Sequence, residues 1–586
     1  MRQFFKYVLA TLTGLVLFAL VGVVLLVALI AAAASSDKEV TVASNSVLEL
    51  KLDKPIGERE FNNPFSGFTG GQSSSIGLDE LKAAIRRAKA DGDIKGIFLN
   101  LELVQGGMAS LEEIRNELLD FKKSGKFVVS YTDAQSEKSY YLASVADKIY
   151  LNPQGTLEFN GLSSETMYYK NLFDKLGVQA QIFRVGSFKS AVEPYFRTNM
   201  SDSARLQTSS FLNSLNDAML SEVAAARKIA PARLKVISDS MLVHNADDAK
   251  RLNLVTDLGY YDQATDYMKG KLGVEKDDKL SLIELSDYEK AEDDEEGSTS
   301  GNRIAVVYAE GDIVTGKGGN ESIGSTRFAE AIRKARLDKK VKAVVLRINS
   351  PGGSSLASDI IYREVMLTKK VKPVIASMSD VAASGGYFIA MGCDTIVAHP
   401  TTITGSIGVF GVLPNIEPFL RDKIGVTTDR VTTGKFSDFP TITRALTPFE
   451  QSQFQAEINR IYADFTTKAA QGRRMPVERL RRLASGRVWS GTEAKQRGLV
   501  DVLGSMDDAL RIAARRANLK EGDYRIQKLP RQKSFAENLF SSFSEEAKLR
   551  MVREEMGPMY PMYQQYKKLS EMKGAQMRMP FEVNVQ

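Results

Sequence analysis

Residues 374–391 read VIASMSDVAASGGYFIAM. The apolar run Val374–Met378 predicts a strand, the small residues after it predict a tight turn, and Tyr387–Met391 predicts a helix. Ser384 lies in that turn, where a small-residue sequence can expose a hydroxyl at the N-terminus of a helix. A second strand–turn–helix pattern precedes it at Val344–Ser354. Because two glycine-rich turns can direct backbone N–H groups at one oxygen, these patterns predict an α/β fold and a candidate nucleophile.

The composition limits the chemistry that is available to this chain. At 586 residues it is too long for one ordinary domain, and a net charge of +6 gives no case for nucleic-acid binding. The one cysteine, Cys393, excludes an intramolecular disulfide and a cysteine-rich zinc site, and its apolar surroundings indicate a core residue. The two histidines, His244 and His399, are so few that histidine is not the expected base for Ser384. We expect no cofactor and no metal.

The N-terminus predicts a membrane anchor. Arg2 and Lys6 precede the uncharged apolar run Tyr7–Ala34, which exceeds the roughly 20 residues that a membrane-spanning helix needs. Positive charges before the run predict a cytoplasmic N-terminus and an exported remainder. The alternative is a cleaved signal peptide, since Ala31–Ser35 offers small residues for cleavage.

The chain contains an internal repeat. The pattern Ile-Gly, Ala-Ile-Arg and Ala within residues 76–88 recurs within residues 323–335, at an offset of 247. Further along, Ala249–Val255 corresponds to Ala494–Val500 with the offset reduced by two. Each half alternates Val- and Ile-rich runs with amphipathic segments, which predicts βαβ units and a largely parallel sheet.

The repeat defines the expected domains. Residues 287–302 are rich in Glu, Asp, Gly and Ser and predict a solvated linker. We interpret the Met-rich tail as a packing or assembly arm; the alternative is an apolar surface for substrate or membrane. The expected parts are a cytoplasmic N-terminus and membrane anchor (1–36), a first α/β domain (45–286), the linker (287–302), a second α/β domain (303–530) and the tail (531–586).

The two halves differ at the positions that carry chemistry. Ser384 corresponds to Glu137 in the first half, so the first half lacks the hydroxyl. Conversely, alignment of Gly186-Ser187-Phe188 with Gly434-Lys435-Phe436 places Lys189 opposite Ser437. One half keeps the serine and the other keeps the lysine, which is expected if a single site takes one residue from each half. Independent random divergence of the two halves would give the same pattern.

Lysine and serine are a workable catalytic pair. A serine hydroxyl becomes a good nucleophile when a base removes its proton, and a lysine amine is such a base when it is neutral. Burial lowers the pKa of a lysine. Phe188 and Phe183 are apolar neighbours of Lys189 in the sequence, although most lysines lie on protein surfaces.

Four motifs occur along the chain: Gly186–Pro194, Asn349–Gly353, Ala382–Tyr387 and Gly405–Val409. Together they resemble the long form of bacterial signal peptide peptidase A (protease IV), in peptidase family S49, and the similarity covers almost the whole chain. The resemblance implies a fold of two tandem ClpP/crotonase-like domains after an N-terminal transmembrane helix.

The resemblance also implies roles for individual residues. Ser384 is the expected nucleophile and Lys189 the expected general base. Backbone N–H groups of Gly353 and Gly385 are expected to form an oxyanion hole, and Ser406 to orient the lysine amine. Short members of this family keep serine and lysine in one domain, whereas this chain separates them.

The expected function is a membrane-anchored serine endopeptidase with a Ser/Lys dyad. It would degrade cleaved signal peptides and other apolar peptides at the outer face of the bacterial inner membrane, with Tyr7–Ala34 as its membrane contact. The family implies a homo-oligomer, by resemblance a tetramer. Two alternatives remain: a catalytically inactive ClpP-like membrane scaffold, and a crotonase-type acyl-CoA enzyme, whose fold also uses glycine-turn N–H groups as an oxyanion hole.

Overall fold

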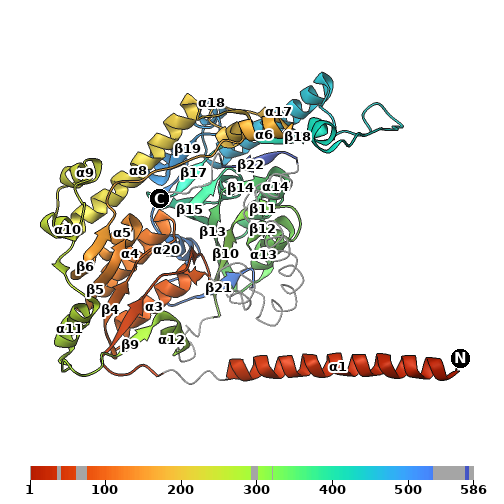
Figure 1. Cartoon of the computed structure of the whole chain (residues 1–586). Helices are drawn as coiled ribbons and strands as arrows, with labels where there is room; N and C mark the ends of the chain where they lie inside the picture. Colours follow the sequence, from red (N-terminus) through yellow and green to blue (C-terminus); the bar gives the residue numbers. More distant parts are fainter. Residues whose placement is uncertain are drawn as a thin grey trace.

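The structure is a computed structural model of the whole chain (Figure 1). Two α/β halves lie against each other, and a third sheet shared by both crosses between them. The residues that the structure describes are 2–35, 41–60, 75–291, 301–319, 321–531 and 574–579.

The first half is built on a parallel six-stranded sheet in the order β8-β6-β5-β4-β1-β9. Its strands are β1 (Ser46–Leu50), β4 (Ile94–Asn100), β5 (Phe127–Gln135), β6 (Lys148–Leu157), β8 (Asp257–Leu258) and β9 (Leu282–Glu284), beside a small pair β2 (Ile56–Gly57) and β3 (Ile76–Gly77). Its helices are α3 (Leu78–Ala90), α4 (Met108–Lys122), α5 (Glu137–Ala143), α6 (Lys170–Leu176), η1 (Ser190–Val192), α7 (Glu193–Phe196), α8 (Asp202–Arg227), α9 (Pro231–Asp239), α10 (Ala246–Arg251), α11 (Tyr261–Leu272) and α12 (Leu285–Lys290).

The second half repeats this plan on an eight-stranded sheet, parallel except where β19 meets β17. Its strands are β10 (Arg303–Glu310), β13 (Val341–Ser350), β15 (Val374–Ala383), β16 (Thr395–Ala398), β17 (Ile403–Gly405), β19 (Val488–Ser490), β20 (Val502–Leu503) and β21 (Arg525–Leu529). Its helices are α13 (Ser325–Leu337), α14 (Ser355–Lys369), α15 (Gly385–Ala390), α16 (Glu417–Phe419), η2 (Leu420–Ile424), α17 (Pro448–Gly472), α18 (Val477–Leu483), α19 (Gly491–Arg497) and α20 (Met506–Arg516).

The third sheet joins segments that are far apart in the sequence. Its order is β12-β11-β14-β22-β18-β7, so a strand of the first half pairs with a strand of the second half. The strands are β7 (Gln179–Arg184), β11 (Asp312–Val314), β12 (Ser322–Gly324), β14 (Gly352–Ser354), β18 (Phe410–Asn415) and β22 (Gln576–Arg578).

The elements of the two halves correspond as the repeat predicts. Helices α3 and α13 begin at residues 78 and 325, and α4 and α14 begin at 108 and 355, both at the offset of 247. Alternate residues of a strand point to opposite faces of its sheet, and in both halves apolar residues on each face pack against helices. In β4, Ile97 and Leu99 pack with α3 and α4, whereas Phe98 packs with α11. In the second half, α20 packs on the corresponding face of the sheet, as α11 does in the first half.

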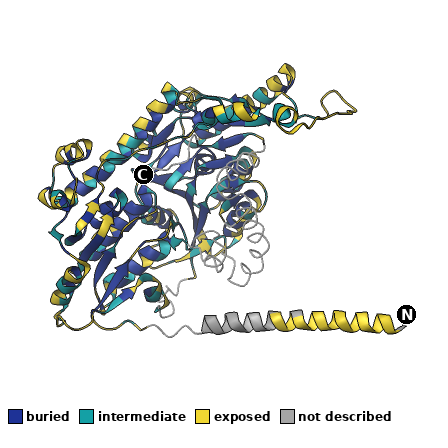
Figure 2. Cartoon of the chain, in the orientation of Figure 1, coloured by how far each residue is buried: buried dark blue, intermediate teal, exposed yellow. Residues whose placement is uncertain are grey.

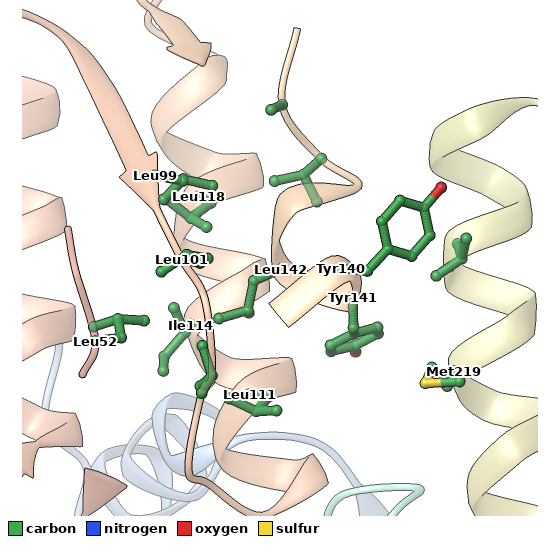
Figure 3. Close-up of a cluster of buried hydrophobic side chains, with 14 of the residues drawn as sticks. Leu52, Leu99, Leu101, Leu111, Ile114, Leu118, Tyr140, Tyr141, Leu142 and Met219 are labelled. Carbon is green, nitrogen blue, oxygen red and sulfur yellow. The ribbon is translucent and has the colours of Figure 1, made fainter. Parts of the chain in front are cut away.

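The core lies in these layers. Figure 2 shows buried strands between helices whose outer surfaces are exposed. In the first-half cluster drawn in Figure 3, Leu99 of β4, Ile114 of α4 and Leu142 of α5 converge, and Met219 of α8 closes the far side. Cys393 is buried and unpaired, as expected of a core residue.

Charged side chains are buried where the halves meet. Arg347 of β13 pairs with Glu58 at 2.7 Å and with Glu113 of α4 at 2.9 Å. His399 Nε2 lies 2.9 Å from the same Glu113 carboxylate. Since buried charges are costly unless they are paired, this network requires one relative placement of the halves.

One expected boundary changes, between the first domain and the linker. Helix α12 continues to Lys290 with Tyr288 fully buried, so the first domain extends beyond residue 286 and the linker predicted at 287–302 begins too early. Most of the Met-rich tail predicted at 531–586 lies outside the described residues. Residues 574–579 of the tail are described and include β22.

At the N-terminal end, α1 (Arg2–Ser35) contains a segment, Gln3–Gly22, that is long and apolar enough to cross a membrane.

Candidate active site

Ser384 lies in the turn between β15 and α15, as the sequence predicts. Its backbone φ is +55°, a left-handed value that costs a non-glycine residue on the order of 1–3 kcal/mol. Its N–H donates to the carbonyl of Gly405 in β17 over 2.8 Å, which holds the turn against the neighbouring strand. The side chain is fully buried. The strained turn therefore fixes the position of the hydroxyl.

Lys189 reaches this hydroxyl from the other half. Its Nζ lies 2.9 Å from Ser384 Oγ. The residue follows β7, whose antiparallel pairing with β18 carries the first-half chain across the second half. The Lys189 side chain is fully buried. The structure thus brings together the two residues that the repeat comparison singled out.

Two glycines, Gly408 and Gly486, make room for Lys189. Sequence analysis included Gly408 in a motif without giving it this role, and it did not identify Gly486. A Cβ built on Gly486 would lie 2.7 Å from Lys189 N and Cβ, and one on Gly408 would lie 3.2 Å from Lys189 Cδ. The N–H of Phe188 donates to the carbonyl of Ser485 over 3.0 Å, which holds the lysine loop against this turn. Gly486 has a φ of +79°, a left-handed backbone conformation that glycine adopts most readily.

The electrostatic setting of Lys189 favours a neutral amine. Burial alone holds its pKa well below the usual value of 10.5. The ring of Phe410 lies 6.0 Å from Nζ. Phe183 instead packs on Phe454, with ring centres 4.7 Å apart, and Phe188 lies beside the Arg487 guanidinium.

Ser406 is the third residue of the cluster. Lys189 Nζ donates to its backbone carbonyl over 3.1 Å and lies 2.9 Å from its Oγ. Ser406 has a φ of +49°, and its N–H donates to the carbonyl of Arg487 over 2.7 Å. Its side chain is fully buried. The lysine amine therefore has three oxygen neighbours, two of which belong to Ser406.

The glycine turns lie beside the serine. A Cβ built on Gly352 would lie 2.7 Å from the backbone N of Gly385, so the two turns are in contact. Gly353 has a φ of +154° and pairs with Ile313 on one side and Met577 on the other. The two predicted oxyanion-hole residues, Gly353 and Gly385, thus belong to turns that are in contact.

The corresponding place in the first half has different chemistry. Burial raises the pKa of Glu137 to about 7, and its Oε1 accepts the Gly161 N–H over 2.9 Å. A cavity of about 830 Å³ opens beside Glu137 and is also lined by Gly106 and Ser163. Ser437, the counterpart of Lys189, lies in the exposed segment 421–437. Its hydroxyl forms hydrogen bonds with the backbone of nearby Gly434, over 2.9 Å.

Metal ligands do not cluster in the described part of the chain: no group of three or more His, Cys, Asp or Glu residues is arranged there to hold an ion. The His399 side chain belongs to the interface network with Glu112 and Glu113. At the site itself, the described residues place the Ser384 hydroxyl, the Lys189 amine and the Ser406 hydroxyl together.

Comparison with known proteins shows which family this chain matches. Residues 120–275 and 366–520, one segment in each half, match peptidase family S49. Protease 4 of Salmonella typhi is 38% identical over 502 residues, covering 83% of this chain and 80% of that protein. The chloroplastic serine protease SPPA of Arabidopsis thaliana is 36% identical over 453 residues, covering 76% of this chain and 67% of that protein.

Among solved structures, ClpP1 from Listeria monocytogenes is 16% identical with a TM-score of 0.24, covering 35% of this chain and 94% of that one. The family matches and the sequence relatives decide the assignment: this chain belongs to peptidase family S49, within its protease 4 (SppA) group of serine proteases.

Proposed function

We propose that the chain is a membrane-anchored serine endopeptidase in which Ser384 is the nucleophile and Lys189 is the general base. The observation that carries this proposal is the 2.9 Å separation of Lys189 Nζ from Ser384 Oγ, both fully buried. A base must lie within hydrogen-bond reach of the proton that it removes, and this pair meets that requirement.

The hydrogen-bond geometry suits a neutral lysine. A neutral amine has two N–H groups and one lone pair. Its N–H groups can donate to the carbonyl and Oγ of Ser406, at 3.1 and 2.9 Å, which leaves the lone pair to accept the Ser384 proton. Ser406 acts as a positioning residue in this scheme, because it directs the lone pair without touching substrate.

The glycine turns supply the remaining part of the mechanism. Attack of Ser384 Oγ on a peptide carbonyl places negative charge on the carbonyl oxygen. The N–H groups of Gly353 and Gly385 stabilise that oxygen in our proposal, since preorganised donors are worth about 3–4 kcal/mol each in such sites. Lys189, now protonated, gives its proton to the departing amine, and water hydrolyses the acyl-enzyme.

We infer an apolar peptide substrate and an extracytoplasmic site. The anchor α1 tethers the enzyme at a bilayer, where signal peptides remain after export. Arg2 and Lys6 flank the apolar segment on its N-terminal side, which favours a cytoplasmic N-terminus at the bacterial inner membrane. The exposed segment 421–437, which contains Ser437, also carries the exposed apolar side chains of Val431 and Phe436. We propose that this segment contacts other copies of the chain in a homo-oligomer.

One experiment separates this function from the alternatives. The full-length protein in detergent is labelled with a serine-reactive fluorophosphonate, and the modified residue is mapped by mass spectrometry. We expect the adduct on Ser384, and none on Ser384 in the Lys189→Ala variant. An inactive scaffold and a crotonase-type enzyme both predict an unmodified Ser384, and that result in the wild-type protein would overturn the proposal.

A further inference from the structure

One buried amide side chain contacts both parts of the candidate active site. Gln207 lies on α8, which belongs to the first half and packs beside β19 of the second half (Figure 1). Its side chain is completely buried. Burial of an amide is costly unless its N–H groups and its oxygen are hydrogen-bonded. The partners of Gln207 therefore show which segments the residue holds together.

The nitrogen of the amide holds the lysine loop. Gln207 Nε2 donates to the carbonyl of Phe188 over 3.0 Å and to the hydroxyl of Ser190 over 2.8 Å. These two residues flank Lys189 in the sequence. The N–H of Ser190 also donates to the carbonyl of Phe188, over 2.8 Å. Gln207 therefore fixes the backbone on both sides of the residue whose amine approaches the serine.

The oxygen of the amide holds the second half. The N–H of Val488 donates to Gln207 Oε1 over 3.2 Å. Val488 is the first residue of β19 and pairs with Gly405 of β17. The carbonyl of Gly405 accepts the N–H of Ser384 over 2.8 Å, and Gly405 directly precedes Ser406. The amide thus connects the lysine loop to the strands that hold the serine turn.

The chemistry of these contacts suits glutamine. Its amide has two N–H groups and one oxygen, and the three hydrogen bonds use all of them. The carbonyl of Phe188 can only accept and the N–H of Val488 can only donate, so the amide has one orientation here. An ionised glutamate has no N–H group and a methionine has neither group. Either residue would leave buried backbone groups without a partner, which is costly.

The second half provides an internal comparison. Helices α8 and α17 both begin after a capping residue, Ser201 and Thr447, whose side chain accepts a backbone N–H of the first turn. Six residues after the cap, α8 has Gln207 and α17 has Gln453. Gln453 is exposed. The glutamine is thus buried in the half that supplies Lys189 and exposed in the half that does not.

We propose that Gln207 is a positioning residue that sets the place of the Lys189 amine relative to the Ser384 hydroxyl. This inference rests on the proposed function. The 2.9 Å contact between these two groups spans the junction of the halves, and Gln207 bonds to the chain on both sides of that junction. Its hydrogen bonds go to neither reacting side chain, so it acts through the lysine loop.

The test is the kinetics of Gln207→Met, which keeps a side chain of similar length and loses all three hydrogen bonds. We expect kcat on an apolar peptide to fall roughly 10²-fold, as when a catalytic group moves by about 1 Å, with KM unchanged. A lysine loop that is no longer held also admits water to the amine, so the rise of kcat/KM with pH should move to higher pH. The charged side chains beside the loop, Arg184, Glu193 and Arg487, are the same in both proteins.

Ser214→Ala is the matched control. Ser214 lies on the same helix, and its hydroxyl bonds to that of Ser490 in β19 over 2.8 Å, so it joins the same two elements without involving the lysine loop. Both variants should lower the temperature midpoint of unfolding, but Ser214→Ala should keep the wild-type kcat and pH profile. If Gln207→Met is destabilised but keeps the wild-type kcat and pH profile, Gln207 is a structural residue and the inference is wrong.

Ser190→Ala supplies a second test if Gln207→Met does not fold. It removes one acceptor of the Gln207 amide and should change kcat and the pH profile in the same direction, by less. An unchanged kcat and pH profile in Ser190→Ala would then overturn the inference.

The outcomes separate this inference from the proposed function. Full activity of Lys189→Ala would overturn the proposed function and leave no lysine base for Gln207 to position. Loss of activity in Lys189→Ala together with a wild-type kcat in Gln207→Met would overturn this inference alone, and the endopeptidase would stand.

Discussion

Lys189 Nζ lies 2.9 Å from Ser384 Oγ although the two residues are 195 positions apart and belong to different halves of the repeat. β7 delivers the lysine by pairing with β18, and the β15–α15 turn presents the serine. The pair exists only while the halves are docked. Perturbations of the docking surface should therefore reduce activity as well as stability.

The pH dependence of hydrolysis should report on Lys189. Because burial holds its pKa well below 10.5, kcat/KM should rise with pH and level off well below that value. Lys189→Ala should lower kcat/KM by about 10²–10⁴-fold, the usual contribution of a general base. Initial rates on an apolar peptide across the pH range measure both effects. A flat profile in the wild-type enzyme would contradict a lysine base.

Gly486→Ala should reduce kcat because the new methyl group overlaps the backbone of Lys189, at 2.7 Å. A displacement of about 1 Å of a catalytic group costs roughly 10²-fold in rate. The matched control is Gly522→Ala, since Gly522 has a similar φ of +85° but nothing lies within 4 Å of a Cβ built there. Equal activity of the two variants would show that the Gly486 contact does not position the lysine.

Lys189→Met should stabilise the fold at neutral pH. The folded-state pKa of Lys189 lies below its unfolded value, so the unfolded chain binds the additional proton and stability rises with pH between the two values. Each pH unit of that window is worth about 1.4 kcal/mol, which the variant recovers. Thermal unfolding at pH 7 and pH 10 measures this difference. We expect the gain to shrink toward pH 10.5; a constant difference would contradict the linkage.

His399 should stabilise the docking of the halves in the opposite pH direction. Burial opposes its protonation, but hydrogen bonds and charge from Glu112 and Glu113 prevail and raise the pKa to about 9. Its stabilising effect is therefore complete below an unfolded pKa of about 6.5 and is lost as pH rises through 9.

A His399→Gln variant, which cannot take the charge, should accordingly be less stable than wild type at pH 6 and approach it above pH 9. The temperature midpoint of unfolding at both pH values gives the comparison. His244→Gln is the control because that side chain is exposed at 66%. The prediction fails if the His399→Gln deficit is the same at pH 6 and above pH 9.

The sequence by itself determined the repeat and the α/β alternation, and it singled out the two residues of the proposed dyad. Hydrophobic periodicity and turn residues are local, so the strand before Ser384 and the helix after it could be read directly from residues 374–391. The complementary differences at Glu137 and Ser437 pointed to one composite site without any coordinates. The start of the linker was misjudged because burial of Tyr288 depends on distant partners, among them Arg87.

Only the tertiary structure decided what surrounds the dyad. The requirement for glycine at 486 comes from a lysine almost 300 positions earlier, and no local pattern reveals such a contact. The buried network of Arg347, Glu113 and His399 likewise forms only when the halves meet. The sequence of the tail showed that it is rich in methionine but not where it lies in the fold. Strand pairing through backbone groups places β22 beside Gly353. Backbone pairing is nearly independent of side-chain identity, so the sequence contains no direct record of it.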